Sequence, residues 1–359
     1  MDQLLYKEDW GKAKTRMEAW WNGEVLDRPA LQVTAPRDKP IGRIKQLAQP
    51  STLYEQWTNA DYVLDKAENY FKQTFFGGEA FPMWWPNFGP DIFAAYLGCA
   101  IEFGENTSWS FPLNNSLAEI AGFTLDEENF WWKKTVDFIN LGVQRGKGRF
   151  IVGLTDIHPG ADGLAALRDP QQLALDAIDD PEGVKEALDA LFDVFVDVYT
   201  KQYDLVKSVS GGSTAWLQAY AENKRWYPTS CDFCCMLSSE MFKDVFLDEL
   251  IDEMRWLDRS LFHLDGPGAL HHLDTFLNIP ELGGIQWVPG AGEQVHGMSK
   301  WIPVLKRIQA ADKLIHIDVQ AHEVEPLLEE LSPKGLMMST SCKSETEARL
   351  LLKRITKYT

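Results

Sequence analysis

Short apolar runs recur along the chain and alternate with longer stretches in which apolar residues follow a helical spacing. Eight runs have the length and the β-branched or aromatic content of buried strands: residues 28–34, 81–87, 149–155, 213–219, 260–265, 284–289, 313–318 and 335–340. Helical periods separate the later runs, at residues 298–311, 322–332 and 344–358. Ser344 and Glu347 have the spacing of a capping box. Strands that alternate with helices predict a parallel sheet.

Eight such strands in one chain predict the α/β class and a single (β/α)8 (TIM) barrel. Long inserts fall in the first half, especially residues 35–80 and 88–148. An open doubly wound sheet is the alternative, but no Gly-x-Gly-x-x-Gly follows the first strand. No Pro/Ser-rich linker divides the chain. We therefore expect a helical N-terminal extension over residues 1–25 and one barrel over residues 26–359.

Composition narrows the possible partners. The chain has 359 residues, is 45% hydrophobic, and carries a net charge of −18 with no basic cluster, which opposes binding to nucleic acid. No apolar run reaches the ~18–20 residues that span a bilayer, and the charged N-terminus lacks a signal-peptide core. Five cysteines in so long a chain do not make a disulfide framework. We expect a cytoplasmic protein without a membrane or nucleic-acid partner.

Polar residues collect at the predicted carboxyl ends of the strands, where barrel enzymes carry their chemistry. They are Asp156, His158, His263, Asp265, His316, Asp318 and Cys342. His263 and Asp265 are two residues apart, so on a strand both point to the same face. Together with Cys342 after the last strand they would suit a zinc ion that keeps one position open. Zinc of this kind makes a bound thiol nucleophilic near neutral pH.

Simpler interpretations of these residues stay open. A His-x-Asp pair is common without a metal, and a lone cysteine such as Cys342 is more often a small buried residue. His271 and His272 follow a Gly-Pro-Gly turn and are expected to have a structural or rim role. The cluster of Cys231, Cys234 and Cys235 has no second Cys or His pair at zinc-finger spacing, so a redox or structural-zinc role is the less favoured one.

Aromatic residues are abundant, with 14 tryptophans. Trp84 and Trp85 lie in a segment interrupted by proline and glycine, and Tyr220 and Trp287 follow or end predicted strands. We expect these four rings to line the barrel mouth and bind a flat substrate or cofactor. Packing against the barrel is the alternative for each of them.

Two stretches carry a family resemblance: "DFCCMLSSEMFKDVFLDELIDEMRWLDRSLFHLDGPG" (232–268) and "IPELGGIQWVPGAG" (279–292). They resemble the uroporphyrinogen decarboxylase superfamily, and most closely its cobalamin-dependent (corrinoid:thiol) methyltransferase branch. "LSSEMF" is similar to that superfamily's Leu-Ser-Pro-Glu-x-Phe, "HLDG" to the branch's His-x-Cys-Gly, and "LDRPALQV" (26–33) is typical of such chains. The resemblance covers roughly residues 50–355.

The resemblance implies a barrel enzyme that moves a methyl group between a corrinoid cofactor (methylcobalamin) or corrinoid protein and a small acceptor. It implies zinc held by His263 and Cys342, with Asp265 where the branch has a cysteine. A carboxylate in place of a thiolate makes the site harder and better suited to an oxygen-bearing acceptor. The decarboxylases' Met-Arg-Gln-Ala-Gly stretch has no counterpart here, so decarboxylation of uroporphyrinogen itself is not expected.

Two other functions remain open. A metal-free decarboxylase or lyase of the same superfamily would act on a small carboxylate, with Asp156, His158 or His316 as general acid or base. A non-catalytic corrinoid carrier would need a cobalt-ligating Asp-x-His-x-x-Gly. The Asp-x-His of residues 156–158 has its glycine at a different spacing, so the carrier is the least favoured.

Overall fold

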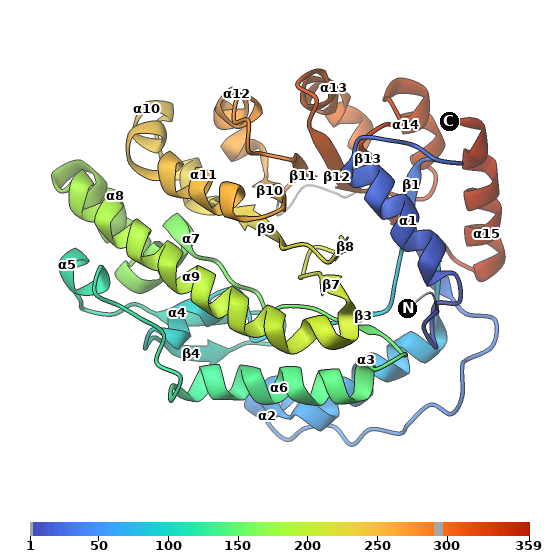
Figure 1. Ribbon diagram of the computed structural model, residues 1–359, viewed down its shortest axis with the longest axis horizontal. Helices are drawn as coiled ribbons and strands as arrows, with labels where there is room; N and C mark the ends of the chain where they lie inside the picture. The colour runs from blue at the N-terminus through green and yellow to red at the C-terminus, as the bar shows by residue number, and fades with distance from the viewer. Residues whose placement is uncertain (1–2, 291–296) are drawn as a thin grey trace.

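A seven-stranded, mostly parallel sheet forms the centre of the molecule (Figure 1). The computed structural model describes residues 3–290 and 297–359. In spatial order the strands are β2 (Thr74–Gly78), β1 (Ala30–Pro36), β13 (Leu336–Ser341), β12 (Leu314–Asp318), β11 (Gly284–Val288), β10 (Arg259–Asp265) and β9 (Trp226–Ser230). All neighbours are parallel except β1 and β2. The predicted α/β class is confirmed.

Six further strands form short pairs outside this sheet. They are the parallel pair β3 (Met83–Trp84) and β6 (Ile151–Val152), and the antiparallel pairs β4 (Ala100–Phe103) with β5 (Ser108–Phe111) and β7 (Gly212–Ser213) with β8 (Ala221–Glu222). The backbone N–H of Leu154 donates to the carbonyl of Thr214 at 2.9 Å, which continues the contact from the β6 segment toward the β7 segment.

One predicted strand is displaced. Of residues 213–219 only the first belongs to a strand, and the neighbour of β10 is instead β9, which the sequence pattern does not mark. Proline is rare inside central strands because it lacks the N–H of the ladder. Pro228, in the middle of β9, hides that strand from a reading of the sequence.

Helices surround the sheet, and α10 to α15 form an arc outside β9–β13 in Figure 1. The α-helices are α1 (Trp10–Trp21), α2 (Leu53–Thr58), α3 (Ala60–Gln73), α4 (Ile92–Tyr96), α5 (Leu117–Ile120), α6 (Phe130–Gly146), α7 (Gly160–Arg168), α8 (Pro170–Asp179), α9 (Pro181–Ser210), α10 (Ser239–Met241), α11 (Leu247–Trp256), α12 (Leu273–Leu277), α13 (Ile302–Ala310), α14 (Val324–Glu330) and α15 (Glu345–Arg354). Shorter turns are η1 (Asp232–Met236), η2 (Phe242–Phe246), η3 (Pro267–His272), η4 (Met298–Trp301) and η5 (Ile355–Lys357). Within the described ranges, no helix has the length and apolarity needed to cross a membrane.

The three helices predicted in the last third are confirmed as α13, α14 and α15. Ser344 caps α15 by accepting from the N–H of Glu347, as the predicted capping box requires. In a full capping box the Glu347 carboxylate would accept from the N–H of Ser344. Here it accepts from the N–H of Lys343 instead. Two pieces of the sequence discussed above, Met1–Asp2 and Ala291–Gly292, lie outside the described residues.

The N-terminal helix α1 closes the amino-end side of the sheet. The indole of Trp20 donates to the carbonyl of Gly335 at 3.0 Å, and that of Trp21 donates to the carbonyl of Tyr220 at 2.9 Å. Both rings pack in one buried cluster with alternate residues of the strands, among them Leu261 of β10. Side chains two residues apart on a strand share a face, so His263 and Asp265 continue this face toward the carboxyl end.

Candidate metal centre

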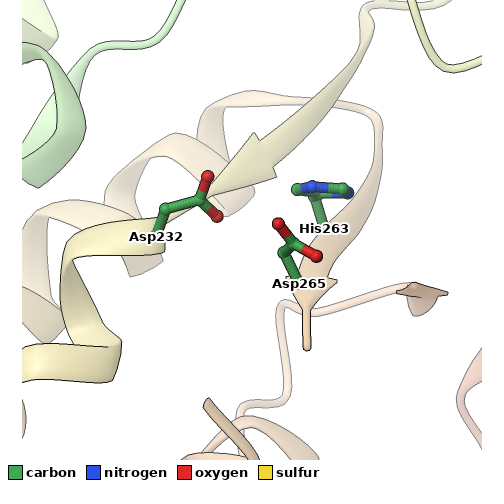
Figure 2. Close-up of side chains that lie close together, drawn as sticks. All are labelled: Asp232, His263 and Asp265. Atoms are coloured by element: carbon green, nitrogen blue, oxygen red, sulfur yellow. The ribbon is translucent and has the colours of Figure 1, made fainter. Parts of the chain in front are cut away.

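Three side chains converge beyond the carboxyl ends of β9 and β10. Asp232 opens η1 just after β9, while His263 and Asp265 lie at the end of β10. Each offers one ligand atom, and these atoms all lie within 4.8 Å of one another. Figure 2 shows the two carboxylates turned toward each other and toward the imidazole. In the part of the chain that the structure describes, this is the one such group of three His, Cys, Asp or Glu side chains.

One ring nitrogen of His263 is held by a neighbouring side chain. Its Nδ1 lies 2.5 Å from Oε1 of Gln286, its partner across the β10–β11 ladder. An amide oxygen only accepts, so Nδ1 carries a proton, and Nε2 is the ring nitrogen left to bind a metal. Trp216 packs edge-on against the ring, with centroids 5.1 Å apart. A histidine that donates its second N–H to a neighbouring acceptor has the arrangement found in metal ligands.

Asp232 is held by a carboxylate from α7. The backbone N–H groups of Asp232 and Phe233 donate to Asp162 at 3.0 and 2.9 Å. The Asp232 side chain is exposed at the rim. Loss of water to the surrounding protein, followed by the charge of Asp162, raises the pKa of Asp232 to about 6. His263 and His158 oppose this rise. Two carboxylates and one imidazole are thus brought together. Such a set of one nitrogen and two oxygen donors fits a divalent cation.

A second histidine, His158, lies close by and is a cation. Its Nε2 is 2.7 Å from Oδ1 of Asp156, and its Nδ1 is 2.8 Å from Oγ of Ser230. Ser230 donates its own proton to Asp162 at 3.0 Å and therefore accepts from His158. Burial opposes the charge, but Asp156 outweighs it and raises the pKa of His158 to about 9. Nδ1 thus donates to Ser230, while Nε2 lies at ion-pair distance from Asp156.

His316 on β12 has the opposite character. Its Nε2 lies 3.2 Å from Oγ of Ser339, while its Nδ1 is buried and has no hydrogen-bond partner among the described residues. Burial lowers the pKa of His316, although Asp318 opposes the effect. The two histidines beside the candidate metal group therefore hold different protonation states.

Two cavities adjoin the group. The first, here called the apolar groove, has a volume of about 490 Å³ and is lined largely by apolar residues of the β4–β5 hairpin, α7 and η1. It reaches Asp232 and His158, and its rim includes the exposed side chains of Trp109 and Met236. The second, here called the polar pocket, has a volume of about 540 Å³ and reaches Gln286, His316 and Trp216. Trp216 lines the polar pocket and contacts both His263 and His158, and His158 lines the apolar groove.

Cys342 does not belong to the group, contrary to the ligand set expected from the sequence. Ser339 of β13 faces the sheet interior, where it contacts His316, and alternation turns Cys342 to the opposite face. There the thiol is buried near Glu347 and Arg354 of α15, and burial followed by the charge of Glu347 raises its pKa to about 11. Asp232, which the sequence did not single out, stands third beside His263 and Asp265.

The four aromatic residues expected at the mouth lie elsewhere. Trp84 stacks on Phe138, Tyr220 packs against Trp10, and Trp287 packs against Trp301. Trp84, Tyr220 and Trp287 are buried in the core, and half-buried Trp85 packs beside the cluster that contains Tyr220. Burial of large rings stabilises the fold, so packing against the rest of the fold describes these four residues better than lining a binding site does. The aromatic side chain that packs against His263 is Trp216.

The remaining histidines and cysteines of this region have structural roles. His271 lies within hydrogen-bond distance of the carbonyls of Gly268 and Leu237, and His272 contacts that of Cys234. These contacts tie η3 to η1, as expected for this pair. The thiol of Cys231 contacts Cys234. This contact, followed by burial, raises the pKa of the Cys231 thiol, so it stays protonated and unreactive.

No known family model matches the chain, and no curated protein matches it.

Proposed function

We propose that this chain is a metal-dependent methyltransferase of the uroporphyrinogen decarboxylase superfamily, built on a (β/α)8 barrel. The motif resemblance over residues 232–292 supports the family. Eight strands would supply the barrel: β1, β3, β6 and the five strands β9–β13. The barrel rule places catalytic groups at the carboxyl ends of such strands, where the candidate metal group lies.

The observation that carries the proposal is the convergence of Asp232, His263 and Asp265, with Gln286 fixing the imidazole. Zinc is the metal that we propose, because it accepts nitrogen and carboxylate donors and tolerates an open position. When bound, it would supply a Lewis acid that lowers the pKa of an acceptor hydroxyl or thiol. The oxygen-rich donor set favours an oxygen-bearing acceptor.

The chain's own residues would organise two ligands beside this centre. The apolar groove reaches Asp232 and offers the exposed indole of Trp109 and thioether of Met236, which suit the apolar surface of a corrinoid or corrinoid protein as methyl donor. The polar pocket, which Trp216 lines, would hold the acceptor. Group transfer requires that two molecules be held beside one reactive centre, and the two cavities would each hold one of them.

A metal-free lyase is the second candidate, and the Asp156–His158 pair favours it. A buried imidazolium with a pKa of about 9 is a proton donor at neutral pH, and it lines the apolar groove. In that function His158 would protonate a developing carbanion, and the metal group would have no part in turnover.

One assay separates the two functions. The purified chain is mixed with methylcobalamin, zinc and a set of thiol and hydroxyl acceptors, and the loss of the methyl–cobalt absorbance is followed. Methyl transfer predicts demethylation that a chelator abolishes and that His263→Ala prevents. Absence of both binding and demethylation of methylcobalamin would refute the methyltransferase and leave the lyase as the function to test.

A further inference from the structure

The polar pocket has walls of uncharged hydrogen-bonding groups. Gln32, Gln286, His316 and Ser339 point into it from β1, β11, β12 and β13, and Trp216 forms one side. Among the described residues, its lining contains no lysine or arginine, and its one carboxylate is Asp318 at the exposed lip. An anionic ligand would meet this carboxylate with no cation to offset the loss of water.

Hydrogen bonds inside the pocket fix the protons. The amide nitrogen of Gln32 donates to the carbonyl of Gln218, so its Oε1 is the free acceptor. Ser339 donates its hydroxyl proton to that oxygen at 2.9 Å. Having one proton, Ser339 must accept from Nε2–H of His316 at 3.2 Å. Nδ1 of His316 is therefore a bare acceptor.

Three side-chain polar atoms of residues lining this pocket have no partner among the described residues: Nδ1 of His316, Nε1 of Trp216 and Oγ1 of Thr340. His316 is only 3% exposed, so leaving its Nδ1 without a hydrogen bond costs free energy unless a ligand donates one. Nδ1 of His316 accepts and Nε1 of Trp216 donates, while the hydroxyl of Thr340 can do either. A hydroxyl group satisfies both kinds of partner, whereas a carboxylate only accepts and an ammonium only donates.

We propose that the polar pocket binds a neutral, hydroxyl-bearing small molecule and that Nδ1 of His316 accepts a hydrogen bond from one of its hydroxyl groups. This molecule is the acceptor of the reaction in so far as the proposed methyl transfer holds. The proposal concerns binding, so it stands apart from the metal and from the methyl donor.

The test uses matched probes on the purified full chain, before and after treatment with a chelator. The pairs are glycerol and glycerate, glucose and gluconate, and catechol and protocatechuate, followed by calorimetry and by tryptophan fluorescence, to which Trp216 contributes. At least one neutral probe should bind, and its carboxylate partner should bind about tenfold more weakly or not at all. The proposal is overturned if no neutral probe binds or if the carboxylates bind as tightly.

Two variants isolate Nδ1. His316→Asn retains an amide near the position of Nδ1, whereas His316→Gln places its amide near Nε2 and loses the acceptor that faces the ligand. Binding of the neutral probe should weaken about tenfold in the glutamine variant and less in the asparagine variant. Equal binding by wild type and both variants, at matched melting temperatures, overturns the role of His316. Probe binding without demethylation of methylcobalamin refutes the methyltransferase alone, and the reverse outcome refutes this proposal alone.

Discussion

Nδ1 of His263 lies 2.5 Å from Oε1 of Gln286, and this contact leaves Nε2 free to bind a metal. Gln286→Leu removes the acceptor and allows the ring to rotate or exchange tautomers. Zinc affinity measured by calorimetry should fall about 10–100-fold, the range for loss of an outer partner of a metal ligand. Gln286→Glu keeps an acceptor oxygen and serves as the matched control, with affinity near that of wild type. Equal weakening in both variants would contradict the role of the oxygen.

The charge of His158 depends on Asp156. In Asp156→Asn the burial that lowers the pKa of His158 remains, but the largest opposing charge is lost. The pKa of His158 should fall from about 9 by roughly 2 units. Titration of the histidine ring signals by NMR measures it, and exposed Asp137→Asn is the control. A pKa that stays near 9 in Asp156→Asn would show that Asp162 and Asp232 hold the proton instead.

A buried carboxyl pair on α11 makes stability depend on pH. Burial raises the pKa of Glu249 to about 8 and raises that of Glu253 well above its ordinary value of 4.5. The folded state therefore binds more protons than the unfolded chain above pH 4.5, so stability falls as the pH rises from there through about 8.

Glu253→Gln removes one group that must ionise. At about pH 8.5 the variant should be more stable than wild type by about 1–2 kcal/mol, and this gain should disappear near pH 5. Thermal or denaturant unfolding at the two pH values measures the difference, with exposed Glu240→Gln as control. A gain that is the same at both pH values would mean that packing, and not ionisation, is responsible.

The sequence predicts the later part of the fold well. Strands β11 and β12 and the first half of β13 are largely buried, so each is a mostly apolar run that a sequence pattern reveals. The earlier strands β3 and β6 have two residues each, and long inserts separate them, so their pairing depends on tertiary contacts that no local pattern encodes.

The candidate site was predicted in part. The rule that polar residues gather at strand ends finds His263, Asp265, His158, Asp156 and His316 from the sequence. It misses Asp232, because Pro228 conceals the strand that Asp232 follows. Cys342 satisfies the rule by its position just after a strand. Side chains alternate along a strand, so Cys342 faces the side opposite to the inward-facing Ser339, and its thiol points to α15. Only the register of β13 reveals this.

Zinc titration of two variants, followed by calorimetry on chelator-treated protein, tests the metal centre most directly. Asp232→Asn removes a ligand that the structure brings to His263 and Asp265, while Cys342→Ser removes the ligand that the sequence alone suggested. Wild type and Cys342→Ser should bind one equivalent of zinc with the same affinity, and Asp232→Asn should bind it about 10–100-fold more weakly. Loss of zinc from Cys342→Ser with retention by Asp232→Asn, or no zinc binding by wild type, would contradict the proposed metal centre.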